Sequence, residues 1–138
     1  MVQCQNIWGL SVGKKVQGDG AKLLDAMLAT GLLVVPGVLT PSEVAAALRA
    51  GAIVVKLFPA STVGVGHLKA LHGPFPGLQV VPTGGISVAT AGEWLAAGAA
   101  AVGLGGELLP KALRDARDWA GISRNASELL RELRQKEA

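Results

Sequence analysis

Cysteine and long apolar runs are scarce in this sequence, and each shortage excludes a class of protein. The one cysteine, Cys4, rules out an internal disulfide and a cysteine-based metal cluster. No apolar stretch reaches the length of a transmembrane helix, and no secretory signal peptide is recognisable. We therefore expect a protein of the reducing cytoplasm with no membrane partner.

Aromatic residues and excess charge are also in short supply. There are two phenylalanines, three tryptophans and no tyrosine, and the formal net charge is only +3. Lysine and arginine are scattered and do not alternate with aromatic residues, which argues against nucleic-acid binding. The mild positive charge favours, at most, an anionic small molecule as ligand.

Small and aliphatic residues are abundant instead. Half of the 138 residues are hydrophobic, led by alanine, valine, leucine and glycine, which is typical of α/β domains. The length allows one domain with a sizeable core. We expect an irregular arm at residues 1–20 and a single α/β domain at residues 21–138.

One lysine interrupts the apolar stretch at residues 52–60. Its flanking Gly51 and Pro59 and its β-branched residues predict a strand of a parallel sheet covered on both faces. Alternation places Val54, Lys56 and Phe58 on one face, so that Lys56 would lie among apolar side chains. Burial disfavours the charged ammonium, which is how a lysine becomes a nucleophile at neutral pH. A lysine that reaches solvent, or pairs with a carboxylate, explains the strand equally well.

Local patterns predict alternating helices and strands along the rest of the chain. Thr40 and Glu43 form a capping box with Pro41 at the first helical position, and Ser87 can cap a later helix. The predicted helices are residues 21–29, 41–49, 67–71, a segment from 87 to about 97, 107–119 and 123–136. The predicted strands are residues 32–35, 52–60, 78–81 and 99–102, with loops at 36–39 and 59–66. We expect His67 and His72 at the surface, and Trp94 and Trp119 between helices and sheet.

The chain also repeats itself with an offset of 46 or 47 residues. The segment VVPG at residues 34–37 recurs as VVPTG at 80–84, and LRAGA at 48–52 recurs as LAAGA at 95–99. Repeated βα units with short loops indicate a barrel or a doubly wound sheet. Lys56 falls opposite Gly103 in the second copy, so the repeated scaffold does not itself require a lysine there.

The unusual residues gather where a parallel sheet binds ligands, beyond the carboxyl ends of its strands. Lys56 is near the end of one predicted strand, Thr83-Gly84-Gly85 follows the next, and residues 103–106 follow the last. Glycine-rich loops expose backbone N–H groups that can hold a phosphate. Tight βα turns need glycine anyway, so the loops alone leave phosphate binding open.

Four motifs stand in order along the chain: VPGVLTPSE at residues 35–43, VKLFPA at 55–60, LKAL at 68–71 followed by PFP at 74–76, and VPTGG at 81–85. Together they resemble the 2-keto-3-deoxy-6-phosphogluconate (KDPG) and 4-hydroxy-2-oxoglutarate aldolase family. The resemblance runs from about residue 23 to the end of the fourth predicted strand. It implies a TIM (β/α)8 barrel of α/β class, assembled as a homo-oligomer, usually a trimer. It also implies a class I lyase that cleaves a phosphorylated 2-keto-3-deoxy sugar acid to pyruvate and glyceraldehyde 3-phosphate.

By this resemblance, Lys56 is the catalytic lysine that forms a Schiff base with the substrate ketone, and no metal or organic cofactor is needed. The resemblance assigns the remaining residues to phosphate binding or to the pocket wall. The implied phosphate-binding residues are Thr83, Gly84, Gly85, Gly105 and Gly106, and the implied pocket residues are Pro36, Phe58 and Pro59. Gly105-Gly106 stands where the family often has Gly-Ser, so a hydroxyl contact to phosphate is lost, and an unphosphorylated sugar acid is an alternative substrate.

The sequence departs from the family in length. Its motifs match only about four βα units, strands five to eight of the barrel, and residues 1–20 contain neither the family's acid/base glutamate nor its carboxylate-binding arginine. A truncated product, a chain that pairs with a copy or partner, and a part of a longer protein are all compatible with this. Two other functions stay open: a non-catalytic half-barrel that binds a phosphorylated ligand or assembles with a partner, and a phosphate-binding isomerase or synthase that does not need Lys56.

Overall fold

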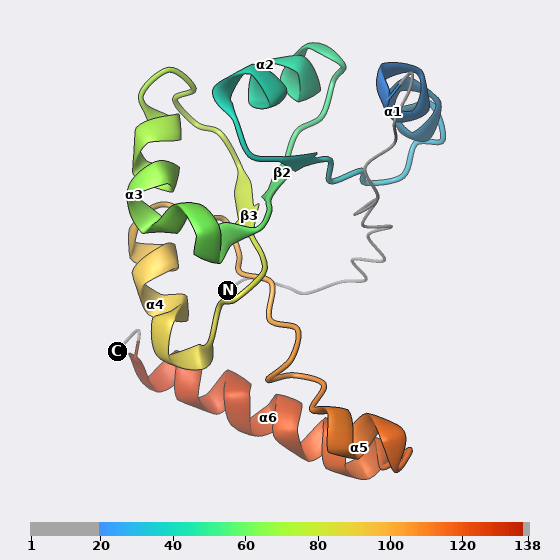
Figure 1. Ribbon diagram of the computed structural model, residues 1–138, viewed down its shortest axis with the longest axis vertical. Coiled ribbons are helices and arrows are strands. Elements are labelled where there is room, and N and C mark those ends of the chain that lie inside the picture. The colour runs from blue at the N-terminus through green and yellow to red at the C-terminus, as the bar shows by residue number, and fades with distance from the viewer. Residues whose placement is uncertain (1–19, 137–138) are drawn as a thin grey trace.

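The structure, a computed structural model, describes residues 20–136 (Figure 1). Three short parallel strands lie at its centre, and helices precede, separate and follow them. The elements are α1 (Gly20–Leu28), β1 (Gly37–Val38), α2 (Pro41–Arg49), β2 (Val55–Leu57), α3 (Ala60–His72), β3 (Val80–Pro82), α4 (Val88–Ala96), α5 (Lys111–Asp115) and α6 (Trp119–Lys136). The expected α/β class with a parallel sheet is confirmed. None of the helices within this range is long and apolar enough to cross a membrane.

The sheet has the order β1-β2-β3, so that β2 is its middle strand. Gly37 of β1 and Val81 of β3 both lie opposite Lys56, and the next rung joins Val38, Leu57 and Pro82. Adjacent rungs point to opposite faces. One face of the sheet therefore carries the Lys56 rung, and the other carries Leu57 and its neighbours.

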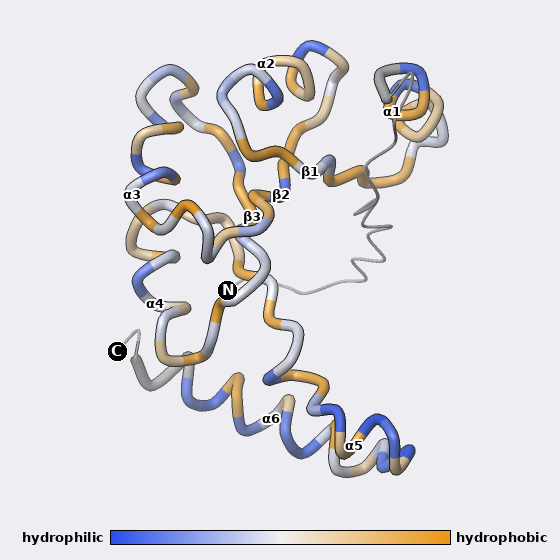
Figure 2. Tube along the Cα trace, in the orientation of Figure 1, coloured by the Kyte–Doolittle hydropathy of each residue, from blue (hydrophilic) through white to orange (hydrophobic). Residues whose placement is uncertain are grey.

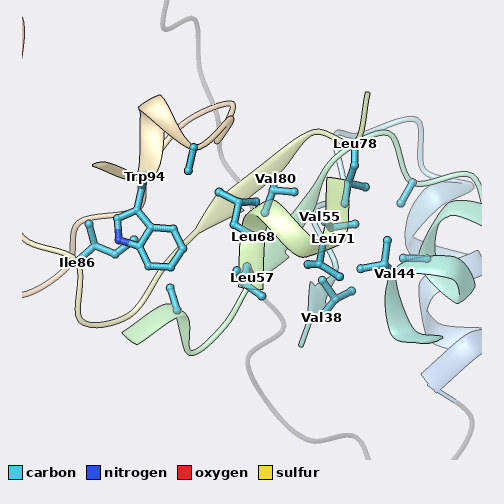
Figure 3. Packing of buried hydrophobic residues seen from close by; sticks show 14 of the residues in the cluster. Val38, Val44, Val55, Leu57, Leu68, Leu71, Leu78, Val80, Ile86 and Trp94 are labelled. Atoms are coloured by element: carbon cyan, nitrogen blue, oxygen red, sulfur yellow. The ribbon is translucent and has the colours of Figure 1, made fainter. Parts of the chain in front are cut away.

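The hydrophobic core lies on the Leu57 face of the sheet (Figure 3). Val55 and Leu57 of β2 are both 0% exposed, and they pack in one cluster with residues of α2, α3 and α4. The labelled members in Figure 3 are Val38, Val44, Val55, Leu57, Leu68, Leu71, Leu78, Val80, Ile86 and Trp94. The prediction that Trp94 packs between helix and sheet is confirmed. Figure 2 shows the same concentration of apolar residues along the strands.

The predicted capping box at Thr40 and the predicted cap at Ser87 both form. The Thr40 side chain accepts a hydrogen bond from the Glu43 N–H at the start of α2, and the Glu43 carboxylate accepts from the Thr40 N–H at 2.8 Å. Ser87 caps α4 in the same way, with Thr90 as its reciprocal partner. The pairs satisfy N–H groups that the first helical turn leaves without intrahelical acceptors. The bounds of α2 match the predicted helix.

The two copies of the repeat also end their helices alike. Gly51 follows α2 and Gly98 follows α4, with φ of +98° and +100°. The residue after each glycine donates its N–H to the carbonyl five residues earlier, at 3.0 Å after α2 and 3.1 Å after α4. This Schellman ending needs a positive φ, which glycine adopts without steric cost. The sequence repeat therefore corresponds to a structural one.

Two predicted strands are wrong. The segment at 32–35 is not a strand: Leu32 is 68% exposed, and pairing with β2 begins only at the Pro36 carbonyl, since proline has no N–H to donate. The first strand instead occupies part of the predicted loop at 36–39. The segment at 99–102 runs beside β3, where the Ala100 N–H donates to the Val80 carbonyl at 2.9 Å, but it forms only one isolated bridge, between Thr83 and Gly103.

Helix boundaries differ from the predictions in two further places. The predicted loop at 59–66 belongs to α3, which contains a break at Gly64, where φ is +72°. The predicted helix at 107–119 shrinks to α5, because Pro110 precedes it and a turn at residues 116–118 separates it from α6. Trp119 begins α6 and is 67% exposed, so the prediction that it packs on the sheet is wrong.

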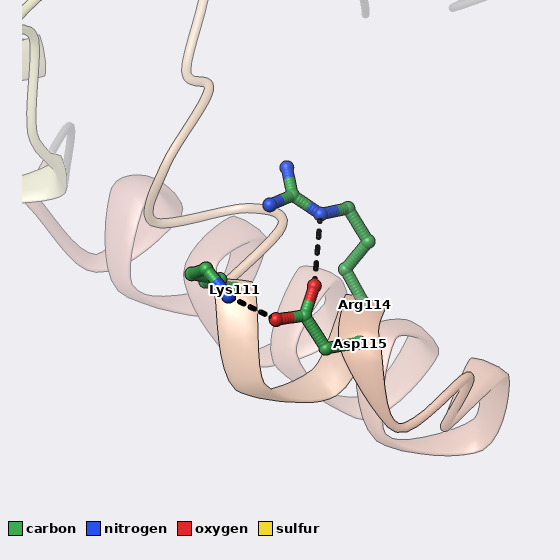
Figure 4. A network of polar contacts seen from close by, with 3 residues as sticks. All are labelled: Lys111, Arg114 and Asp115. Carbon is green, nitrogen blue, oxygen red and sulfur yellow. Dashed lines mark hydrogen bonds and ion pairs between the residues drawn. The ribbon is translucent and has the colours of Figure 1, made fainter.

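The α5–α6 pair extends away from the sheet, with α6 running beneath α4 (Figure 1). On α5, the Lys111 ammonium pairs with Asp115 one helical turn later, and Arg114 Nε lies 3.6 Å from the same carboxylate (Figure 4). All three side chains are solvent-exposed, so the network contributes little to the stability of the fold.

Candidate active site

Lys56 occupies the middle of the middle strand. Its N–H donates to the Pro36 carbonyl at 2.8 Å, and its neighbours on the rung are Gly37 and Val81. The side chain is half-buried. Within residues 20–136, the Lys56 rung is only partly buried whereas the Leu57 rung is buried, so the second cover expected for this strand is not found among these residues. The fully apolar surroundings expected for Lys56 belong to the neighbouring rung, that of Leu57.

Phe58 shares the face of Lys56, as the alternation predicts. The Lys56 Nζ lies 4.9 Å from the centroid of the Phe58 ring, which is within the range of a cation–π contact worth about 0.5–1 kcal/mol at an exposed site. Phe58 itself is 45% exposed. The ring therefore lies beside the lysine ammonium, and both side chains are partly exposed.

The Phe58 ring also meets the first glycine loop. A Cβ added at Gly84 would lie 3.0 Å from the Phe58 Cε2 and 3.5 Å from the Pro59 Cα. Gly84 also has a φ of +93°, which side chains rarely tolerate. Close approach and backbone conformation both require glycine, and the Phe58 ring lies next to both Lys56 and Gly84.

Hydrogen bonds hold this loop against the start of α3. The Thr83 N–H donates to the Leu57 carbonyl at 3.0 Å, and the N–H groups of Ala60 and Ser61 donate to the Thr83 and Gly84 carbonyls at 2.9 and 3.0 Å. The loop thus turns its carbonyls toward α3. Within residues 20–136, the N–H groups of Gly84 and Gly85 find no acceptor, which is the arrangement that an anion needs.

Ser61 is a neighbour of this loop that the sequence analysis missed. A Cβ added at Gly85 would lie 2.6 Å from the Ser61 Oγ, so the second glycine of the pair is needed for close packing against α3. No local sequence pattern predicts this contact, because Ser61 and Gly85 are 24 residues apart in the sequence.

The second glycine loop lies next to the first. Thr83 and Gly103 form a parallel bridge, and a side chain at Gly103 would collide with the Thr83 side chain. Gly103, which matches Lys56 in the repeat, therefore has no room for a side chain. Gly105 and Gly106 are exposed, and added Cβ atoms there would meet nothing within 4 Å.

The end of the second loop carries two residues that the sequence analysis did not select. The Val88 N–H, at the start of α4, donates to the Glu107 Oε2 at 2.7 Å. The Asn125 side-chain amide on α6 donates to the carbonyls of Glu107 and Leu108 at 2.6 and 3.1 Å. These contacts join residues 17 to 19 positions apart, beyond the reach of local patterns.

The prediction that both histidines lie at the surface is wrong, because His67 and His72 are each partly buried. The part-buried His67 Nε2 lies 2.7 Å from the Leu39 carbonyl and ties α3 to the loop after β1. The His72 Nε2 is buried without a hydrogen-bond partner. Within residues 20–136, no three His, Cys, Asp or Glu side chains come together as metal ligands could.

The comparison with known proteins decides the family. The family model described as KDPG and KHG aldolase matches residues 16–125, which include all four motifs and both glycine loops. This chain belongs to the KDPG and KHG aldolase family. The match covers most of the sequence, so the resemblance found in the four motifs is confirmed.

Individual members of the KDPG and KHG aldolase family are similar over about the same region. The 2-dehydro-3-deoxy-phosphogluconate aldolase of Pseudomonas aeruginosa is 39% identical over 110 residues, 79% of this chain and 50% of that protein. The 2-dehydro-3-deoxy-6-phosphogalactonate aldolase of Escherichia coli is 39% identical over 79 residues, 56% of this chain and 38% of that protein. The chain spans about half the length of the curated relatives it matches.

A solved structure extends the likeness to the fold. The KDPG aldolase of Legionella pneumophila, with pyruvate captured as a covalent carbinolamine intermediate, superposes with a TM-score of 0.71 at 32% identity. The superposition covers 78% of this chain and 52% of that one. The family's structures have a TIM-barrel-type fold, and the parallel βα arrangement of this chain agrees with it.

Proposed function

We propose that this chain is a class I aldolase that cleaves a 2-keto-3-deoxy sugar acid, phosphorylated or not, to pyruvate and an aldehyde. The Lys56 amine attacks the C2 ketone and expels water, which gives an iminium. A base removes the proton of the C4 hydroxyl, the C3–C4 bond breaks, and its electron pair neutralises the iminium as an enamine. The aldehyde leaves, C3 takes up a proton, and water releases pyruvate and restores the amine.

The observation that carries this proposal is the place of Lys56 in a member of this family. It is the lysine of the VKLFPA motif, it stands on the accessible face of the middle strand, and its Nζ is 4.9 Å from the Phe58 ring centroid. The same ring packs on Gly84. We assign Pro36, Phe58 and Pro59 to the wall around the keto acid, because they surround Lys56 along β1 and β2.

We assign the distal part of the substrate to the glycine loops, Thr83-Gly84-Gly85 and Gly105-Gly106. The unaccepted N–H groups of Gly84 and Gly85 support this assignment. The Phe58 ring lies next to both parts of this site, because it is 4.9 Å from the Lys56 Nζ and packs against Gly84.

We further propose that β1, β2, β3 and the extended segment at 99–103 are strands five to eight of a barrel, whose interior is the Lys56 face. The acid/base glutamate and the arginine for the substrate carboxylate then come from a segment outside these four units, which a longer natural protein or a partner chain supplies. Proton transfer to a positioned group contributes about 10²–10⁴-fold to such reactions. We expect the chain alone to form the Schiff base and to turn over more slowly by this factor.

Borohydride reduction in the presence of pyruvate tests the proposal. The expected result is a mass increase that maps to Lys56, disappears in Lys56→Ala and persists in Lys69→Ala. Lys69 is the matched control because it is an exposed lysine on α3. A chain that shows no adduct under saturating pyruvate is not a Schiff-base aldolase. In that case binding of inorganic phosphate without an adduct would favour a non-catalytic half-barrel.

A further inference from the structure

The two glycine loops run side by side as a strip, and the Glu107 carboxylate links them at one end of it. The strip begins at the bridge between Thr83 and Gly103 and ends where the Val88 N–H donates to Glu107 Oε2 at 2.7 Å. The two links are only five sequence positions apart on one side, from Thr83 to Val88, and four on the other, from Gly103 to Glu107. A five-residue segment spans at most about 17 Å when fully extended, and this one turns twice at positive φ. An anion held on the N–H groups of Gly84 and Gly85 would therefore lie well within that span of the Val88 N–H, to which the Glu107 carboxylate is bound.

The position of Glu107 is built into the fold. The Asn125 side-chain amide on α6 donates to the two backbone carbonyls that flank Leu108, those of Glu107 and of Leu108 itself. These bonds fix the turn that aims the carboxylate back at α4. The side chain is thus anchored at both ends, by Asn125 through its backbone and by Val88 at its tip.

The Glu107 carboxylate also lies at the N-terminus of α4, where it accepts the Val88 N–H. The N-terminus of a helix carries a partial positive charge, which stabilises a negative group there. In α4 that group is the protein's own carboxylate. A phosphate on the adjacent loop would meet repulsion from this carboxylate and would not gain the Val88 N–H. The neighbouring Gly105 and Gly106 offer no side-chain hydroxyl in compensation.

We propose that Glu107 is a specificity-determining residue that selects sugar acids whose distal end is an uncharged hydroxyl and disfavours those that end in a phosphate. This inference rests on the proposed function and names the substrate class of the same site. The hydroxyl end of such a substrate can donate to the Glu107 carboxylate and accept from the glycine N–H groups. A phosphate dianion can only accept.

Titration with inorganic phosphate tests the effect of the charge. The amide NMR signals of Gly84 and Gly85 report binding in the unmodified chain, in Glu107→Gln and in Glu93→Gln. Glutamine keeps an oxygen acceptor for the Val88 N–H and removes only the charge. Glu93 lies farther along the same helix, so its variant matches the change in net charge. We expect Glu107→Gln to bind phosphate about threefold to tenfold more tightly and Glu93→Gln to bind like the unmodified chain. Equal affinities in all three proteins would overturn the inference.

Trapping with two substrates tests selection at the site itself. Borohydride reduction of Lys56 is compared for 2-keto-3-deoxygluconate and for its 6-phosphate. The unmodified chain is expected to be trapped at lower concentrations of the unphosphorylated acid, and Glu107→Gln is expected to shift the ratio toward the phosphate ester by the same threefold to tenfold. If Glu107 were only a structural cap, Glu107→Gln would change trapping by both substrates equally, and this outcome would contradict the inference. A preference of the unmodified chain for the phosphate ester would overturn it as well. Failure of pyruvate to label Lys56 would instead refute the proposed function, and the phosphate titration still decides the role of the charge.

Discussion

Replacing Gly84 by alanine should damage both the stability of the chain and the position of the Phe58 ring. The added Cβ would lie 3.0 and 3.1 Å from the Phe58 Cε2 and Cδ2, where ordinary contacts begin at about 3.4 Å. The backbone adds a second cost, because φ at Gly84 is +93°. Both effects act at the loop that the ring links to Lys56.

The magnitude follows from the two contributions. A side chain at positive φ costs about 1–2 kcal/mol. An overlap that displaces neighbours costs about 1–3 kcal/mol, and the lower end applies because Phe58 is half-exposed and can move. We expect Gly84→Ala to lower the free energy of unfolding by about 2–3 kcal/mol. Gly77→Ala is the control: Gly77 has a φ of +81° but open space around its Cβ position, so that variant should lose only about 1–2 kcal/mol.

Urea unfolding of both variants measures this difference, and the rate of borohydride trapping with pyruvate reports its effect on Lys56. In the double variant Gly84→Ala with Phe58→Leu, the overlap disappears and the backbone strain stays, so the free energy of unfolding should no longer include the overlap cost. The reasoning fails if Gly84→Ala and Gly77→Ala destabilise equally, or if removal of the Phe58 ring changes nothing in the Gly84→Ala background. Slower trapping in Gly84→Ala but not in Gly77→Ala would tie the ring to the orientation of the lysine.

Two further predictions concern the scaffold. Leu57→Ala should lower the free energy of unfolding in urea by about 2–5 kcal/mol, because the side chain is 0% exposed. Ile53→Ala, at a position that is 73% exposed, should change it by no more than about 0.5 kcal/mol. Equal losses in the two variants would contradict the assignment of the core face. Hydrogen bonds from the N–H groups of Leu39 and Thr40 lower the pKa of Glu43 below its ordinary value of about 4.5. The ionised Glu43 carboxylate therefore stabilises the fold above that pH, and this stabilisation is lost as the pH falls and the carboxylate is protonated. The free energy of unfolding should decrease between about pH 6 and pH 3.5 in the unmodified chain, and it should decrease less in Glu43→Gln.

Local chemistry explains what the sequence allowed us to predict. The capping box of Thr40 and Glu43 acts within four residues, and so does the glycine that ends each repeated helix. The predicted bounds of α2 follow from such short-range interactions, and the two Schellman endings, which the structure revealed, have the same short range. The pairing of Lys56 and Phe58 on one face needed only strand alternation. Each of these features depends on residues that are neighbours in the sequence.

The missed features depend on contacts between distant segments. The apolar run before Pro36 looked like a strand, but the register with β2 starts at the Pro36 carbonyl, and register is a property of two strands. The links from Glu107 to Val88 and from His67 to Leu39 join residues 19 and 28 positions apart. The face on which Lys56 lies was predictable, but the identity of the covered face was not, since it depends on where α2, α3 and α4 pack.

The correction to the surroundings of Lys56 changes the argument for its chemistry. A lysine enclosed on both sides by apolar residues could not admit a substrate without opening the core. Alternation in β2 instead separates the two tasks: Val55 and Leu57 hold the sheet to the helices, and Lys56 lies on the face that is only partly buried within residues 20–136. Loss of the lysine side chain therefore removes the proposed nucleophile without removing a core contact. The same separation places the selectivity of the site at its far end, where the Glu107 charge can change without any change in the core.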